Sequence, residues 1–375
     1  MALTPVDGPP GPPWQRELSG AVDAFVVTSD RLADNPLGDP AVRPLYVYRA
    51  PGVAAPVRDS TPLRDSTPLR DSAPRSAAAV PVVFVLQAFL NQADRWFNRE
   101  TFEPTVFERL DALFRGGEAP PAVVVFADAW TSLGGAQFIN SPGVGAYSDY
   151  LCDEVVPFVE ARYAVRRDAT GRGVAGHSSG GHGALVNAML RPDVFGAVSS
   201  RAGDALFEVS MAPDFPRAAK LLRDHFDGSI DVFLEAFRTR ERFDYGRFGL
   251  LLTVYAAAAA YSAEPDGRVR LPFDPRTGRI IPEVFTRWLA WDPVQMAAGH
   301  AEALHGLVRI HLEAGRRDEV NLDLGAQALA DELTRLGVAH TFELFDGGHG
   351  GGAHRLPGAI RELVLALDAV RESPG

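Results

Sequence analysis

Residues 173–190 read GVAGHSSGGHGALVNAML, and this segment gives the clearest indication of the fold. Within it, Gly176-His177-Ser178-Ser179-Gly180 matches the pattern G-x-S-x-G, which places a serine on a sharp turn from a strand into a helix. The small residues two before and two after Ser178 let strand and helix approach each other. We therefore predict that Ser178 is a nucleophile. The alternative is a tight glycine-rich connection without chemistry.

Apolar runs and helical patterns alternate on both sides of this turn. Residues 80–86 (VPVVFVL) and 122–127 (AVVVFA) are continuous apolar runs, typical of strands that are buried on both faces. The alternation predicts an α/β fold with a doubly wound, mostly parallel sheet. Further strands are expected at 45–49, 173–176, 195–200, 307–312 and 340–345, and helices at 147–163, 180–190, 326–336 and 357–370.

Three segments depart from this rhythm. We expect residues 1–20 to be disordered, because the first part is rich in proline and glycine. Residues 58–76 hold the repeats RDSTPL, RDSTPL and RDSAPR, which predict a solvated low-complexity loop at a hairpin tip between strands 45–49 and 80–87. Residues 205–300 have helical segments, including a buried one at 248–263, but no strand–helix repeat. They are expected to form a helical cap inserted into one domain spanning 21–375.

The charge and the cysteine content of the chain indicate which binding partners and which compartment suit the protein. Lys and Arg number 37 and Asp and Glu 48, so the formal net charge is −11. This sign argues against nucleic acid or an anionic membrane as the main partner. The single cysteine, Cys152, excludes an internal disulfide and is compatible with a reducing compartment. We expect a cytoplasmic protein without membrane spans; a homo-oligomer is compatible with the sequence.

A serine nucleophile needs a base, usually a histidine that is in turn held by an acid. His349 lies in FDGGHGGG, between the last predicted strand and the last predicted helix, and His354 is its competitor. Asp318 follows the 307–312 strand, and Asp204, which follows the 195–200 strand, is the runner-up acid. The loops at the carboxyl ends of parallel strands converge at one edge of a sheet. The order Ser178, Asp318, His349 is that of α/β-hydrolases.

Acyl transfer also needs hydrogen-bond donors for the developing oxyanion. One donor should be the backbone N–H of Ser179, directly after the nucleophile. The other should come from residues 87–90, which follow the 80–86 strand.

Several stretches together resemble the putative-esterase family of α/β-hydrolases, which contains esterase D, enterochelin esterase and the mycolyltransferases. The resemblance is carried by VVFVLQAFLNQ, VVVFADAWTSLGGAQFINSPGVGAYSDYLCDEVVPFVEARY, GVAGHSSGGHGALVNAMLRPDVFGAVSS, EAGRRDEVNLDLGAQALADELTRLGVAH and FELFDGGHGG. It implies an α/β-hydrolase fold, a triad of Ser178, Asp318 and His349, and a second oxyanion donor at the Phe89 backbone. The chain departs from the family at Gln87-Ala88, where members often have His-Gly or Ser-Gly.

The sequence therefore predicts a serine esterase that cleaves a small-molecule ester or thioester through an acyl-enzyme, without a metal or organic cofactor. The alternatives are transfer of the acyl group to an alcohol or sugar, and a binding protein with a dead triad. Four aromatic residues of the expected cap could line an acyl pocket or pack the cap's own core: Phe207, Phe215, Trp288 and Trp291.

Overall fold

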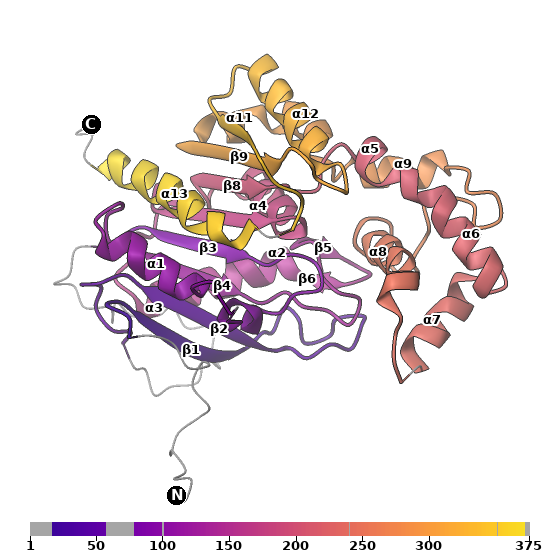
Figure 1. The fold of residues 1–375 in the computed structure, drawn as a ribbon, viewed down its shortest axis with the longest axis horizontal. Helices are drawn as coiled ribbons and strands as arrows, with labels where there is room; N and C mark the ends of the chain where they lie inside the picture. Colours follow the sequence, from indigo (N-terminus) through magenta and orange to yellow (C-terminus); the bar gives the residue numbers. More distant parts are fainter. Residues whose placement is uncertain (1–16, 58–78, 100, 240, 351, 372–375) are drawn as a thin grey trace, which may run out of the picture.

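The computed structural model describes residues 17–57, 79–99, 101–239, 241–350 and 352–371. These residues form an eight-stranded sheet in the order β1-β2-β4-β3-β7-β8-β9-β10. β2 is antiparallel to both β1 and β4, and the remaining neighbours are parallel, which confirms the predicted mostly parallel sheet (Figure 1). The strands are β1 Ala21–Thr28, β2 Val42–Arg49, β3 Val82–Leu86, β4 Val123–Ala127, β7 Arg172–His177, β8 Ala197–Arg201, β9 Arg309–Gly315 and β10 Thr341–Phe345.

The central strands are apolar throughout because both faces of the sheet are covered. Every residue of β3 and β4 is buried. Along β3, Val82, Phe84 and Leu86 belong to one core cluster, whereas Val83 and Val85 belong to a second. Successive side chains of a strand point to opposite faces, so a strand between two helical layers needs apolar residues at each position.

Each face carries its own layer of helices. The smaller core cluster lies under α1 Val106–Arg115 and α13 Leu356–Arg371, which contact each other. The larger cluster lies under α3 Val156–Arg162, α4 Ser179–Leu190 and α12 Leu322–Arg335. The helix predicted at 147–163 begins as α2 Tyr147–Asp149 and passes through a π-helical turn, η2 Tyr150–Val155, before α3. A two-stranded ribbon, β5 Asn140–Ser141 and β6 Gly145–Ala146, precedes α2.

The chain between β8 and β9 is helical, and we call residues 207–306 the helical insertion. Its aromatic side chains pack on one another: the ring centroids of Phe215 and Trp288 are 5.6 Å apart, and those of Phe226 and Phe233 are 5.2 Å apart. Figure 1 shows α6 to α9 grouped beside the sheet. The helices of the insertion are α5 Phe207–Ser210, α6 Phe215–His225, α7 Ile230–Thr239, α8 Tyr245–Tyr261, α9 Pro282–Leu289, α10 Pro293–Ala297 and α11 Ala301–Gly306.

The first part of the chain differs from two of the expectations. The hairpin placed around residues 58–76 is wrong, because β4 lies between β2 and β3 in the sheet. The low-complexity segment itself lies outside the described residues, as do residues 1–16 of the expected disordered start. Gly20, which was expected to belong to that start, is described, and its amide donates to Asp111 Oδ1 over 2.7 Å.

Among the described helices, none is long and apolar enough to cross a membrane.

Candidate active site

Ser178 lies at the turn between β7 and α4, in a backbone conformation that serine rarely adopts. Its φ is 56° and its ψ is −126°. The turn is closed tightly on both sides: a Cβ on Gly176 would lie 2.1 Å from the carbonyl oxygen of Gly180, and a Cβ on Gly180 would lie 2.3 Å from the carbonyl oxygen of Leu86. Only glycine fits at these two positions. The packing of strand and helix therefore explains both the spacing of the motif and the strained serine between them.

The structure brings Ser178, His349 and Asp318 together from three separate loops. His349 Nε2 lies 3.1 Å from Ser178 Oγ, and His349 Nδ1 lies 2.9 Å from Asp318 Oδ2. His349 comes from the loop between β10 and α13, and Asp318 from the loop between β9 and α12. Both loops follow parallel strands, so they meet at the same edge of the sheet as the turn at Ser178.

The surroundings of His349 favour its protonated form. Burial alone would lower the pKa of the imidazole, but the hydrogen bond and charge of Asp318, with the charges of Asp204 and Glu319, raise it above its usual value. The Asp318 side chain has no exposed surface, and that of His349 is 24% exposed. Glu319 Oε2 also accepts a hydrogen bond of 2.8 Å from the His349 amide, which fixes the backbone of this loop.

The two competitors occupy other positions. Asp204 is buried near the same histidine, but the carboxylate that accepts from the His349 ring is that of Asp318. Burial raises the pKa of Asp204 to about 6, against the opposing effects of the His349 charge and a hydrogen bond from Gln137. His354 is exposed on the cavity wall, and the imidazole within reach of Ser178 Oγ is that of His349.

The two backbone amides expected at the oxyanion site, those of Phe89 and Ser179, belong to residues that line the same cavity as Ser178. Within the described part of the chain, neither amide donates a hydrogen bond to the protein. Ala88, which stands where the family often has glycine, lies outside the left-handed region, and the positive φ of 66° falls on Leu90 instead. Alanine at position 88 is therefore compatible with this loop.

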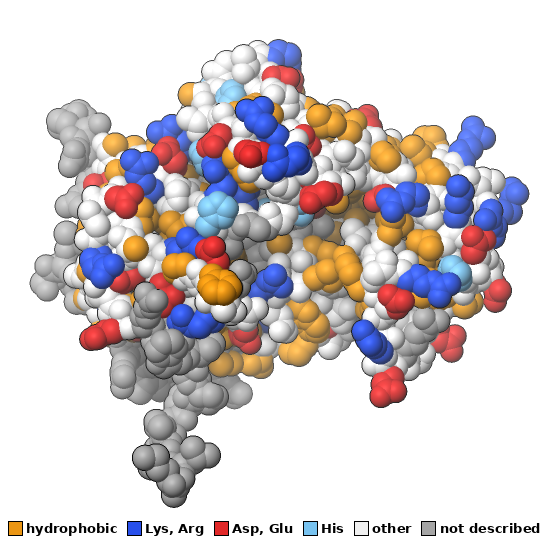
Figure 2. Space-filling view, viewed as in Figure 1, with side chains coloured by type: hydrophobic (Ala, Val, Ile, Leu, Met, Phe, Trp, Pro, Cys, Tyr) orange, Lys and Arg blue, Asp and Glu red, His pale blue; other side chains and the backbone are white. Residues whose placement is uncertain are grey.

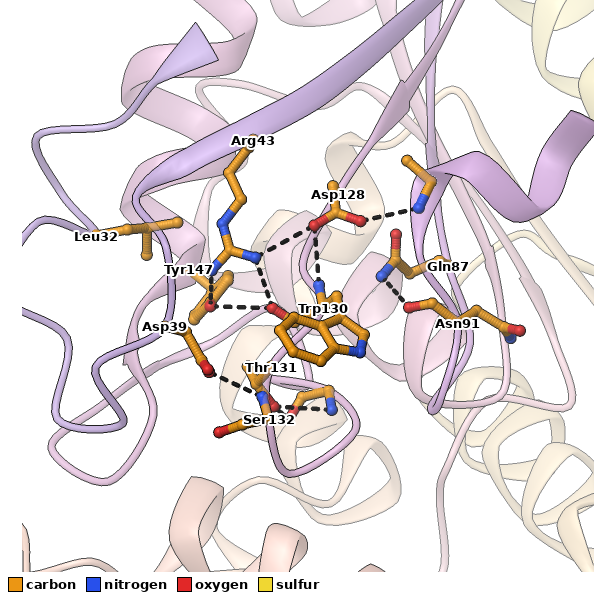
Figure 3. Close-up of polar contacts among 12 residues, drawn as sticks. Leu32, Asp39, Arg43, Gln87, Asn91, Asp128, Trp130, Thr131, Ser132 and Tyr147 are labelled. Atoms are coloured by element: carbon orange, nitrogen blue, oxygen red, sulfur yellow. Dashed lines mark hydrogen bonds and ion pairs between the residues drawn. The ribbon is translucent and has the colours of Figure 1, made fainter. Parts of the chain in front are cut away.

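A buried ion pair that the sequence did not reveal holds the loop after β3. Arg43 Nη1 lies 3.3 Å from Asp128 Oδ2, and each side chain is 3% exposed. Asp128 Oδ1 accepts from the Ala93 amide over 2.8 Å, while Arg43 Nη1 donates to the Trp130 carbonyl over 2.7 Å (Figure 3). Burial raises the pKa of Asp128, against the lowering effects of the Ala93 amide and Arg43.

The same view shows how the loop is closed on itself. Gln87 Nε2 donates to the Asn91 carbonyl (Figure 3). In addition, the Leu90 amide donates to the Gly134 carbonyl over 2.7 Å. The network thus ties the loop that carries Phe89 to the loop after β4. Its long-range contacts, such as that between Arg43 and Asp128, join residues that are distant in the sequence, so no local pattern indicates the network.

The two histidines that flank the serine turn have different surroundings. The ring of His177 lies 4.8 Å from that of His349, and its Nε2 donates to the His349 carbonyl over 3.0 Å. Burial and the nearby charge of Arg201 lower the pKa of His177 well below its usual value. His182 is fully buried and its Nε2 donates to the Trp291 carbonyl over 2.9 Å, so it packs in the core.

A cavity of about 940 Å³ opens around Ser178 and His349. One wall comes from the sheet edge, and another comes from the helical insertion, including Met211, Val254 and Ala257. Figure 2 shows apolar side chains gathered on this face between the sheet and the insertion. Phe215 and Trp288 also border the cavity, but both are fully buried in the insertion, and Trp288 Nε1 donates to Ser262 Oγ over 2.8 Å.

Comparisons with known proteins agree with this architecture. A model of the putative-esterase family matches residues 72–356, which is more than half of the chain. A ferulic acid esterase shares the fold at 17% identity with a TM-score of 0.54, over 94% of this chain and 100% of that chain. An S-formylglutathione hydrolase from Agrobacterium tumefaciens shares it at 13% identity with a TM-score of 0.51, over 95% and 97% of the two chains. A search of the curated proteins found no match. The chain therefore belongs to the putative-esterase family, with an α/β-hydrolase fold, and is a carboxylic-ester hydrolase.

Proposed function

We propose that the protein is a serine esterase that cleaves a small-molecule carboxylic ester or thioester through an acyl-enzyme intermediate. Ser178 is the nucleophile, His349 the general base and acid, and Asp318 the acid that holds His349. The observation that carries this proposal is the unbroken chain of contacts from Ser178 Oγ to His349 Nε2 over 3.1 Å and from His349 Nδ1 to Asp318 Oδ2 over 2.9 Å.

The geometry supports one direction of proton transfer. Because the Asp318 carboxylate accepts from Nδ1–H, Nε2 is left as the acceptor that faces the serine hydroxyl. His349 takes the Ser178 proton as Oγ attacks the carbonyl carbon, and it delivers that proton to the leaving alcohol or thiol. Water then attacks the acyl carbon while His349 takes a proton from it. The bond between the acyl carbon and Ser178 Oγ breaks, His349 returns the proton to Oγ, and the carboxylic acid leaves.

The developing oxyanion needs donors that the protein itself does not use. The amides of Phe89 and Ser179 meet this condition among the described residues and border the cavity beside Ser178. We propose that both donate to the carbonyl oxygen as it becomes negatively charged, while the Arg43–Asp128 pair positions the Phe89 loop.

The test compares wild type with Ser178→Ala in hydrolysis of p-nitrophenyl acyl esters and thioesters, together with labelling by a fluorophosphonate. We expect Ser178→Ala to lose turnover by at least about 10⁴-fold and to lose the label. Ser210→Ala is a matched control, because Ser210 lines the cavity but its hydroxyl donates to the Ala205 carbonyl over 2.9 Å. Turnover by folded Ser178→Ala within tenfold of wild type would refute the nucleophile assignment.

The same assay separates the alternatives. A wild-type protein that neither takes the label nor hydrolyses any ester would be a binding protein. A product that forms only when an acceptor alcohol or sugar is added would make it an acyltransferase. The cytoplasmic location expected from the sequence stays a prediction, which cell fractionation tests.

A further inference from the structure

Arg201 is a cation beside the nucleophile that the proposed reaction does not use. It is the last residue of β8, and its carbonyl accepts a hydrogen bond of 3.0 Å from the Ser178 amide. In the sheet it pairs with His177 of β7 and with Glu313 of β9. These three side chains therefore lie side by side on one face of the sheet, the face that α13 covers.

The guanidinium of Arg201 has no hydrogen-bond or ion-pair partner among the residues that the structure describes. Its Nε atom is buried, and no described residue supplies an acceptor for it. The neighbouring carboxylate of Glu313 is engaged by another arginine, since Arg355 Nε lies 2.7 Å from Glu313 Oε2. A guanidinium has five donors in a rigid fork and stays charged, so leaving it unpaired costs free energy unless a ligand supplies the acceptor.

Arg201 lines the same cavity as Ser178 and His349. Its guanidinium lies against Gly352 in the loop that follows His349, where a Cβ would come within 2.4 Å of Nη1. Burial lowers the pKa of Arg201 to about 10, although the charge of Glu313 opposes this effect, so the side chain is still cationic at neutral pH. The adjacent His177 is neutral, because burial lowers its pKa well below the usual value.

The position of Arg201 also indicates which half of a substrate it would meet. In the proposed reaction the carbonyl oxygen faces the amides of Phe89 and Ser179, whereas the leaving group takes its proton from His349. Arg201 lies on the His349 side of the site: Gly352 belongs to the His349 loop, and the ring of His177 contacts that of His349. A group bound by Arg201 would therefore belong to the alcohol or thiol half.

We propose that Arg201 binds a carboxylate carried by the leaving alcohol or thiol of the substrate, so that the enzyme prefers esters with an anionic leaving group. This inference rests on the proposed serine esterase function. A carboxylate matches the planar fork of a guanidinium and can accept two parallel hydrogen bonds from it. The pairing would satisfy donors that have no acceptor within the described protein.

The test uses two esters of the same shape, 3-acetoxybenzoate and its neutral amide, 3-acetoxybenzamide. We expect wild type to favour the benzoate by about 10- to 100-fold in kcat/KM, because a hydrogen bond between charged groups contributes a preference of about this size. Arg201→Met should lower kcat/KM for the benzoate by that factor more than for the benzamide, and Arg201→Lys should restore part of the preference. Arg217→Met is the matched control, because Arg217 also lines the cavity but is paired with Asp214 over 2.7 Å; it should keep the wild-type ratio.

A second measurement is independent of turnover. Binding of the two esters to the Ser178→Ala protein should show the same preference for the benzoate, and the added Arg201→Met change should remove it. Equal binding of both esters, or an Arg201→Met change that weakens both equally, would overturn the proposal and leave Arg201 as a support of the His349 loop. Failure of both esters to react in wild type would instead count against the proposed esterase reaction.

Discussion

The loops at the carboxyl edge of the sheet and the helical insertion at residues 207–306 line the same cavity, but different forces position them. At the sheet edge, Ser178 is held at a φ of 56° between glycines that have no room for a Cβ. In the insertion, aromatic rings pack against one another, as Phe215 does with Trp288 at a centroid distance of 5.6 Å. At Gly246 of the insertion, the nearest described atom outside the helix backbone to the site of a Cβ is Asp244 Oδ1, at 3.6 Å.

The two regions should therefore respond differently to amino-acid substitution. Backbone strain and close approach tolerate only particular residues, so a small change at the sheet edge should displace the reacting atoms. Apolar packing is less directional and accepts many side chains of suitable volume. Substitutions in the insertion should therefore alter stability and substrate preference more than the chemical step.

The largest effect is expected at the acid that contacts His349. Asp318→Asn should reduce turnover by about 10⁴-fold, because an amide can favour the wrong imidazole tautomer and cannot stabilise the imidazolium. Asp204→Asn, at the start of the segment that leads into the insertion, should cost about tenfold or less, since the carboxylate that accepts from the His349 ring is that of Asp318. Turnover of both variants at one pH, after circular dichroism has established folding, gives the comparison. An inactive Asp204→Asn beside a nearly normal Asp318→Asn would exchange the two roles.

A smaller effect is expected from adding one methyl group to a glycine of each region. In Gly180→Ala the new Cβ would lie 2.3 Å from the Leu86 carbonyl oxygen, so the turn at Ser178 must shift. We expect a loss of about 1–3 kcal/mol of stability from overpacking and about 10²-fold in turnover from misplacement of the serine. Gly246→Ala, in an exposed part of α8, should instead gain about 0.5 kcal/mol and keep its activity. Thermal unfolding and turnover of the two variants measure this difference, and equal tolerance at both sites would remove the contrast between the regions.

The smallest effect is expected in the pH dependence of activity. His349 must be neutral to accept the serine proton, and its pKa is raised chiefly by Asp318 against the effect of burial. Activity should therefore fall as pH drops through a value above 6.5, the ordinary pKa of histidine. Asp204→Asn should move this acid limb of kcat/KM to lower pH, because the charge of Asp204 also contributes to the rise. A pH profile of the variant that coincides with that of wild type would mean that the two groups are not coupled.

The sequence predicted those parts of the molecule that follow from local steric requirements or from the general geometry of parallel sheets. The strand, turn and helix around Ser178 follow from two glycines spaced around a serine, and the structure has β7 and α4 there. The loops that hold Asp318 and His349 could be placed because parallel strands bring their carboxyl ends together. The geometry now puts the three side chains in hydrogen-bond contact, while their catalytic roles stay proposals.

What the sequence did not predict depends on partners that are distant along the chain. β4 separates β2 from β3, and no local pattern reports which strands become neighbours. The buried pair Arg43–Asp128 likewise becomes visible only in three dimensions, as does the guanidinium of Arg201, which has no partner in the described part of the chain. The insertion was predicted only as helical, because apolar packing among its aromatic residues leaves no fixed spacing to recognise.

In the proposed mechanism, Ser178 is the residue that carries the acyl group. Rapid acid quenching of the wild-type protein during turnover of p-nitrophenyl acetate, followed by proteolysis and mass spectrometry, should find one acetyl group on the peptide that holds Ser178, with fragment ions that place it on that residue. Asp318→Asn should accumulate the same species more slowly, and Ser178→Ala should not form it. Acetylation confined to another residue, or undiminished turnover by Ser178→Ala, would contradict the proposed mechanism.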